Sequence, residues 1–205
     1  MVAPDLPGHG ARRSERFSLD SALTTIDDAV ASLPGEPPLV VGFSLGGYLA
    51  LHWAGLERRP IAGIVAASCG TAPNRVVLDG WRVLAAGIHE LPDRGLLLNN
   101  SLLRLAVREP TFVSDVIAGG VALEVMQDTL RELRRVHTID SVRAIHEPIT
   151  FINGALDHFR LQERRFVRAA RHGELVHIRG ATHLVPLVRP EQFDGAIATA
   201  LAQLP

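Results

Sequence analysis

The sequence contains no lysine and only one cysteine, and aromatic residues make up only 5% of it. Because Cys69 stands alone, an intramolecular disulfide and a cysteine-rich metal site are both excluded. Cys69 follows an apolar run, which predicts a small buried thiol rather than a reactive one. All of the side-chain positive charge apart from histidine comes from arginine, which we interpret as a sign of GC-rich codon usage.

The charge of the chain is nearly balanced. Its 21 basic and 22 acidic residues give a net charge of -1 and an isoelectric point near 6.8. This balance gives no electrostatic reason to expect a nucleic acid or an anionic membrane as a partner. No signal-like segment opens the sequence, and no apolar run reaches the roughly 18 residues that span a bilayer. We therefore expect a soluble, cytoplasmic protein, and the sequence leaves its oligomeric state open.

The first part of the chain alternates between strand and helix patterns. Residues 39–41 and 61–67 are apolar runs typical of buried strands, and residues 45–55 between them are typical of a helix. A further helix pattern begins near Ser18 or Asp20. This alternation predicts a mostly parallel sheet with crossover helices, that is, an α/β fold, and 205 residues suit one such domain.

The alternation stops between residues 71 and 143, where helical patterns are broken by proline and glycine. Strand patterns resume at 148–154 and 174–178, and a closing helix is expected over 190–204. We therefore divide the chain into an N-terminal core part (1–70), a helical insertion (71–143) and a C-terminal core part (144–205). The insertion is a candidate lid over a binding site, with candidate lining residues Leu97, Leu98, Phe112 and Val116.

The motif Gly42-Phe43-Ser44-Leu45-Gly46-Gly47 lies between the strand at 39–41 and the helix at 45–55. Strand, tight turn and helix is the setting in which such a motif exposes a serine hydroxyl at the apex of the turn. Small residues at Gly42 and Gly46 would let neighbouring segments pass close to the turn. Ser44 is therefore a candidate nucleophile, and the backbone N–H of Leu45 is a candidate donor to an oxyanion.

Two further candidates follow later strands. Asp157 lies just beyond the strand at 148–154, and His183 lies just beyond the strand at 174–178. Parallel strands assemble sites at their carboxyl ends, where Ser44 also lies. Taken singly, an aspartate in a glycine loop is more often a turn former, and a loop histidine is more often a solvated side chain. His158 adjoins Asp157 and is a candidate for lining the pocket, whereas the other histidines are less well placed: His52, His89, His137, His146 and His177.

With Ser, Asp and His in this order, the sequence resembles the α/β-hydrolase superfamily, especially its small, lid-bearing, esterase-like members. Residues 2–10 resemble the family's D-x-P-G-x-G turn, and residues 42–47 resemble its nucleophile elbow. Residues 153–157 resemble its acid loop, and residues 180–190 resemble its histidine loop. The resemblance implies that Ser44 is the nucleophile, that His183 is the general base and then acid, and that Asp157 orients the imidazole. Asp5 and His9 would form the turn and take no part in catalysis. No metal or organic cofactor is implied.

The resemblance breaks down at the start of the chain. Members of the family normally have about three strands and a helix before the D-x-P-G-x-G turn, with a His-Gly loop that supplies a second oxyanion donor. Loss of one such donor lowers kcat by roughly 10²- to 10³-fold. The strand at 39–41 would also become an exposed edge. We therefore expect that Met1 is not the natural start and that a valine codon, GTG, was taken for an initiation codon.

The function predicted from the sequence is a serine hydrolase that cleaves an ester-like bond of a small, partly hydrophobic molecule. Thioester hydrolysis, cleavage of a carbon–carbon bond in a diketone, and acyl transfer to another acceptor remain open, because fold and triad do not separate them. A catalytically impaired remnant, or a binding protein on the same scaffold, is the alternative from a different class.

Overall fold

The structure is a computed structural model that describes residues 1–204, and it contains two compact units. The helical unit comprises residues 1–25 and 73–135. The sheet unit comprises residues 26–72 and the chain from residue 136 onward. Helix α1 (Leu19–Ala31) begins in the helical unit and ends in the sheet unit.

The sheet unit is built on four parallel strands in the order β1-β2-β3-β4, namely β1 (Leu39–Phe43), β2 (Gly63–Ala67), β3 (Ile149–Gly154) and β4 (Gly173–Ile178). All five residues of β2 and all six of β3 are buried, as expected for central strands covered on both faces. In the register of the sheet, Phe43 pairs with Ala67 and Ala67 pairs with Ile152. The predicted α/β class with a parallel sheet is confirmed.

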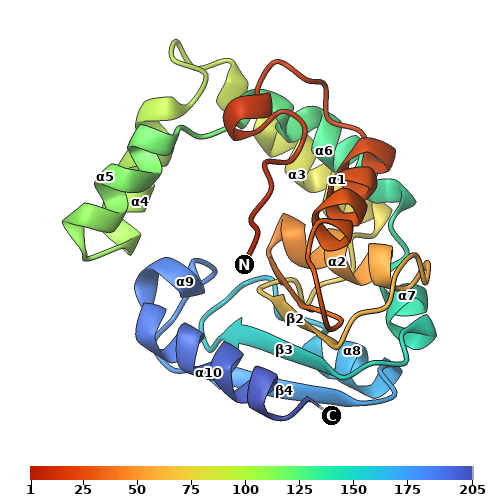
Figure 1. Cartoon of the computed structure of the whole chain (residues 1–205). Helices are drawn as coiled ribbons and strands as arrows, with labels where there is room; N and C mark the ends of the chain where they lie inside the picture. The colour runs from red at the N-terminus through yellow and green to blue at the C-terminus, as the bar shows by residue number, and fades with distance from the viewer. Residues whose placement is uncertain (205) are drawn as a thin grey trace. The chain divides into compact units, whose positions relative to one another are not determined.

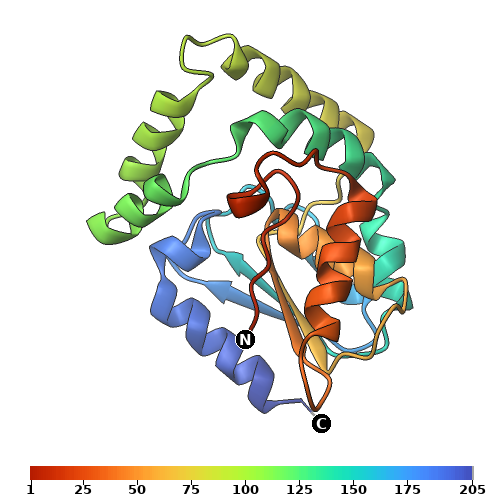
Figure 2. The same ribbon diagram turned by 45° about the horizontal axis from the view of Figure 1, so that its top comes forward.

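Helices cover both faces of this sheet. The helices α2 (Leu45–Ala54), α7 (Thr138–Ala144) and α8 (Glu163–Ala169) lie on one face, and α9 (Val185–Val188) and α10 (Pro190–Ala202) lie on the other (Figures 1 and 2). Successive side chains of β3 point to opposite faces of the sheet. Phe151 packs edge-on against Phe166 of α8 with ring centroids 6.0 Å apart, whereas Ile152 joins the core that contains Phe193 of α10.

Most strand and helix positions agree with the sequence patterns, and the differences are at the ends. Strand β2 begins at Gly63 rather than at residue 61, and α10 ends at Ala202 rather than at residue 204. The short helix α9 was not predicted, because four residues are too few to show a helical period. Cys69 is fully buried, which confirms the expectation of a buried thiol.

The helical unit contains the helices α3 (Arg75–His89), α4 (Leu96–Ala106), α5 (Pro110–Gly119) and α6 (Met126–Glu132), with short 3-10 turns η1 (Gly10–Arg12), η2 (Leu123–Val125) and η3 (Leu133–Arg135). Within it, α3 packs on α6 and α4 packs on α5. Helix α3 is capped by Asn74, whose side chain accepts a hydrogen bond from the Val77 N–H. None of the helices within residues 1–204 is long and apolar enough to cross a membrane. The role of this segment as a lid stays a prediction.

Residues 1–25 belong to the helical unit, although the sequence patterns led us to group residues 1–70 together. Ion pairs link this N-terminal stretch to residues 124–135 at distances of about 3 Å: Arg13 with Glu124, Arg16 with Asp128 and Asp20 with Arg135. The spacing of apolar residues along a helix cannot predict ion pairs between residues this far apart in the sequence. Helix α7, all but the last residue of which lies within 71–143, belongs to the sheet unit.

The turn at the start of the chain is organised by Asp5. Its carboxylate accepts a hydrogen bond from the Ala11 N–H at 2.9 Å. Gly10 has a φ of +51° and leaves no room for a Cβ beside that carboxylate. The imidazole of His9 lies 3.0 Å from the Pro7 carbonyl. Both Asp5 and His9 thus have turn-forming contacts within the helical unit.

Candidate active site

Ser44 lies at the junction between β1 and α2, where the chain makes a sharp and strained turn. Its φ of 52° and ψ of -115° are unusual for a residue with a side chain. The Ser44 N–H donates to the Ala67 carbonyl at 2.8 Å, and the Ser44 carbonyl accepts from the N–H groups of Gly47 and Tyr48. The turn is therefore held by the sheet on one side and by the first helical turn on the other.

The two small residues of this turn have different roles. A Cβ at Gly42 would overlap the backbone of α2, lying 2.6 Å from the carbonyl carbon of Gly46 and 2.8 Å from the Cα of Gly47. A Cβ at Gly46 would meet nothing within 4 Å outside its own helix. Our expectation that both glycines are needed for close passage is therefore wrong for Gly46, whose own Cβ position is open.

We expect Gly42→Ala to lower the free energy of unfolding by roughly 1–3 kcal/mol or more, because backbone atoms must move to admit the methyl group. Gly46→Ala is the matched control. Helix propensity favours alanine there by about 1 kcal/mol, so stability should be unchanged or slightly higher. Urea unfolding of both variants measures the difference, and equal midpoints for the two would contradict this account.

His183 follows β4 and reaches Ser44. Its Nε2 lies 2.9 Å from the Ser44 Oγ. The segment that carries His183 is tied to the segment that carries Asp157 by backbone hydrogen bonds, from Ala155 N–H to the Ile178 carbonyl and from Leu156 N–H to the Ala181 carbonyl, each 2.9 Å long. The two loops are therefore fixed against each other.

Asp157 completes a continuous chain of hydrogen-bonding groups. Its Oδ1 and Oδ2 lie 3.2 and 3.3 Å from the His183 Nδ1, and Oδ1 also accepts from the Phe159 N–H at 2.8 Å. Burial disfavours the charged carboxylate, but these hydrogen bonds outweigh it and hold the pKa of Asp157 below its ordinary value. An ionised carboxylate can only accept, so Nδ1 carries the proton of the imidazole and Nε2 accepts from the serine hydroxyl.

The ring of His183 lies among other aromatic rings of the sheet unit. The ring centroids of Phe43, Phe159 and His158 are 5.5, 4.8 and 5.5 Å from that of His183. The side chain of His158 is more than half exposed, and its Nδ1 lies 3.9 Å from the Asp157 carboxylate. Partial burial and the neighbouring His183 lower the pKa of His158.

The backbone N–H of Leu45 is placed as the candidate oxyanion donor requires. Leu45 is the first residue of α2, so its N–H is not used by the helix and adjoins Ser44.

Most of the other histidines have hydrogen-bonding partners away from Ser44. These pairs are His52 with Ser141, His89 with the Leu123 carbonyl, His146 with Arg171, and His177 with Glu163.

The sequence patterns did not indicate that Glu163 is a buried carboxylate. Glu163 accepts from Asn153 Nδ2 at 3.0 Å and contacts His177 Nε2 at 2.9 Å and Arg160 Nε at 3.4 Å. Arg160 in turn donates to the Ala155 carbonyl at 2.6 Å, within the loop that carries Asp157. The only sequence signal was the spacing of Arg160 and Glu163, three residues apart, which is common on exposed helices.

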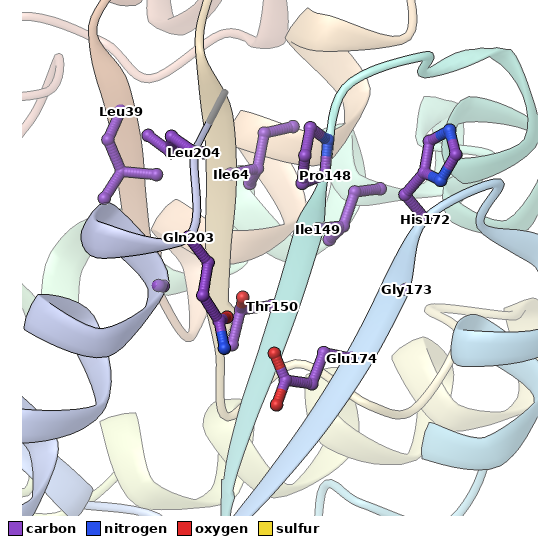
Figure 3. Close-up of a pocket in the computed structure, with 11 residues that line it drawn as sticks. Leu39, Ile64, Pro148, Ile149, Thr150, His172, Gly173, Glu174, Gln203 and Leu204 are labelled. Carbon is purple, nitrogen blue, oxygen red and sulfur yellow. The ribbon is translucent and has the colours of Figure 1, made fainter.

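A pocket of about 280 Å³ lies at the other end of the sheet. It is bordered by Leu39, Ile64, Ile149 and Gly173, which stand at or near the amino ends of the four strands (Figure 3). The side chains of Thr150, Glu174 and Gln203 converge on it. Because Ser44 follows the carboxyl end of β1, this pocket is separate from the candidate active site.

Comparisons with known proteins identify the family and the fold of the chain. The profile described as "Alpha/beta hydrolase family" matches residues 1–196. Among solved structures, a bromoperoxidase from Bacillus anthracis has a TM-score of 0.78 at 15% identity, over 97% of this chain and 80% of that one. A thermophilic esterase from Thermogutta terrifontis has a TM-score of 0.70 at 17% identity, over 99% of this chain and 75% of that one. At such identities these likenesses concern the fold alone.

Two curated relatives are longer than this chain. The pimeloyl-[acyl-carrier protein] methyl ester esterase of Chromobacterium violaceum is 40% identical over 78 residues, which are 38% of this chain and 28% of that protein. The dihydrolipoyllysine-residue acetyltransferase component of the acetoin cleaving system of Pseudomonas putida is 26% identical over 95% of this chain and 54% of its own length. The chain thus spans about half or less of either relative. With the family profile matching nearly its whole length, the chain belongs to the alpha/beta hydrolase family.

Proposed function

We propose that the protein is a serine hydrolase that cleaves an ester-like bond through an acyl-enzyme intermediate. The observation that carries the proposal is the unbroken series of contacts from the Ser44 Oγ to His183 and on to the buried Asp157. A serine hydroxyl is a weak nucleophile until an adjacent base removes its proton, and the base needs a third group to orient it. Each of these requirements has a candidate residue in the sheet unit.

In the proposed reaction, Ser44 Oγ attacks the carbonyl carbon while its proton passes to His183 Nε2. The Leu45 N–H donates to the developing oxyanion, and Asp157 stabilises the imidazolium. His183 then gives the proton to the leaving alcohol as the carbon–oxygen bond breaks. A water molecule attacks the acyl-enzyme with His183 again as base, and this second step releases the acid and restores the Ser44 hydroxyl.

A small, partly hydrophobic substrate is the favoured class. Phe43 and Phe159 lie against the ring of His183 and offer apolar surface next to the reacting atoms. The name of the Chromobacterium relative, a methyl ester esterase, agrees with an ester substrate. Three other reactions would use the same three side chains: hydrolysis of a thioester, cleavage of the carbon–carbon bond of a diketone, and acyl transfer to another acceptor. We rank these reactions after ester hydrolysis.

Labelling with a fluorophosphonate probe tests the proposal. We expect the probe to form a covalent adduct with Ser44 alone, identified by mass spectrometry of the tryptic peptides. Labelling should be lost in His183→Ala, because the hydroxyl then has no base. The absence of labelling in a sample shown by circular dichroism to be folded would overturn the proposal in favour of a non-catalytic protein. If Ser44 is labelled, the rates of hydrolysis of esters of graded acyl length would define the substrate.

A further inference from the structure

A second serine with a positive φ follows the strand next to that of Ser44. Ser44 and Ser68 directly follow β1 and β2, and their φ angles are 52° and 53°. Phe43 and Ala67, the residues before them, pair in the register of the sheet. Each serine N–H continues the sheet, from Ser44 to the Ala67 carbonyl and from Ser68 to the Ile152 carbonyl. The two strained serines are therefore neighbours on adjacent strands.

Both serine hydroxyls contact His183, one at its ring and the other at its backbone carbonyl. The Ser44 hydroxyl lies 2.9 Å from the ring Nε2, and the Ser68 hydroxyl donates to the backbone carbonyl of His183 at 3.0 Å. Strand β2 lies between β1 and β3, so Ser68 stands between the serine turn and the loop that carries Asp157. The Ser68 hydroxyl is also among the groups that lower the pKa of Asp157.

The properties of Ser68 favour a role for its hydroxyl over a role for its backbone alone. A positive φ is easiest for glycine, and a serine there carries a conformational cost that needs an offsetting contact. The side chain is fully buried, so the hydroxyl has lost its contacts with water and depends on partners in the protein. Full burial also rules out Ser68 as a nucleophile for a substrate that approaches from solvent.

We propose that Ser68 is a positioning residue, whose buried hydroxyl fixes the backbone of His183 so that the imidazole spans Ser44 and Asp157. This inference rests on the proposed function for its effect on catalysis, but the geometry of His183 can be measured without a substrate. A small displacement of the base lowers the rate without weakening substrate binding, because the acceleration depends on the alignment of the reacting atoms.

Two substitutions separate the effect of the Ser68 hydroxyl from the effect of the strained backbone. Ser68→Ala removes the hydroxyl and keeps the strain, whereas Ser68→Gly removes both. We expect kcat for ester hydrolysis to fall by roughly 5- to 10-fold in both variants, with KM changed by less than about 2-fold. Thermal unfolding should show Ser68→Gly to be at least as stable as Ser68→Ala. The far-downfield proton resonance of the His183 Nδ1–H, identified by its loss in His183→Ala, should move or broaden in both.

Ser141→Ala is the matched control, because Ser141 is also a buried serine whose hydroxyl donates to a backbone carbonyl, that of His137, and contacts a histidine, His52. It lies against Gly55, at the opposite end of α2 from Ser44. We expect this control to leave kcat within about 2-fold and the resonance in place. An unchanged kcat and resonance in Ser68→Gly would overturn the proposal, as would an activity loss confined to Ser68→Ala.

The same measurements separate this inference from the function on which it rests. If wild-type protein neither hydrolyses esters nor reacts with the fluorophosphonate, while the His183 resonance still moves in both Ser68 variants, the serine-hydrolase proposal fails and the positioning of His183 by Ser68 stands. If wild-type protein is active and the Ser68 variants match it in kcat and resonance, only the role of Ser68 fails.

Discussion

Replacing Ser44 with alanine is expected to lower kcat for ester hydrolysis by roughly 10⁶-fold, close to the limit of detection. In serine hydrolases, removal of the nucleophile alone costs about as much as removal of all its catalytic partners, because the three groups act as a unit. Ser44→Ala removes only the hydroxyl oxygen that lies 2.9 Å from His183 Nε2, and leaves the backbone turn and its hydrogen bonds in place. Steady-state hydrolysis of a chromogenic ester, at equal concentrations of folded wild-type and variant protein, measures the loss.

The control for this substitution is Ser32→Ala. Ser32 is an exposed serine of the sheet unit whose hydroxyl donates to the Ala29 carbonyl, remote from the carboxyl ends of the strands. We expect it to leave kcat within about 2-fold. A Ser44→Ala protein that keeps more than about 1% of the wild-type kcat would mean that another group is the nucleophile.

Replacing Asp157 with asparagine is expected to lower kcat by roughly 10⁴-fold with little change of shape. The amide of asparagine can turn an N–H toward the imidazole, which then presents Nδ1 as an acceptor and carries its proton on Nε2. In that tautomer His183 cannot accept the proton of Ser44, and the negative charge that stabilises the imidazolium is also lost. Because the pKa of Asp157 is held below its ordinary value, the wild-type residue carries that charge throughout the neutral range.

Asp140→Asn is the matched control for this substitution. Asp140 is an exposed aspartate of the sheet unit, paired with Arg143 at 2.9 Å and without a contact to the site. We expect its kcat to stay within about 2-fold of wild type, as exposed pairs of this kind contribute little. A fall of less than 10-fold in Asp157→Asn, measured on folded protein, would show that another carboxylate orients the histidine.

The patterns around Ser44, Asp157 and His183 were readable because each is local. The apolar run before Ser44 and the helical period after it predict strand, turn and helix without knowledge of any partner, and the other two residues likewise follow recognisable strands. Parallel pairing then requires the three strand ends to lie on the same edge. The hydrogen-bond distances among the three side chains did not follow from these patterns, since they depend on how two loops are tied together.

Ser68 and Glu163 could not be found in this way. The hydroxyl of Ser68 meets a carbonyl 115 positions later, and nothing in the neighbouring residue types indicates a positive φ at a serine that ends a strand. In the sequence, Glu163 looks like an exposed charged residue of a helix, three positions after Arg160. In the structure it is buried and contacts Asn153 and His177. Both residues owe their roles to contacts made only after the strands have paired.

The amino-acid sequence by itself determined the four strands and most of the helices of the sheet unit, and that a serine, an aspartate and a histidine follow three parallel strands. These properties depend on the period of apolar side chains and on turn residues, which act over a few positions. Only the tertiary structure decided that residues 1–25 pack with the helical unit, that Gly42 but not Gly46 is sterically required, and that Ser68 holds the backbone of His183. Those features depend on atoms that are distant in the chain and meet within a few ångströms, a distance that no local pattern encodes.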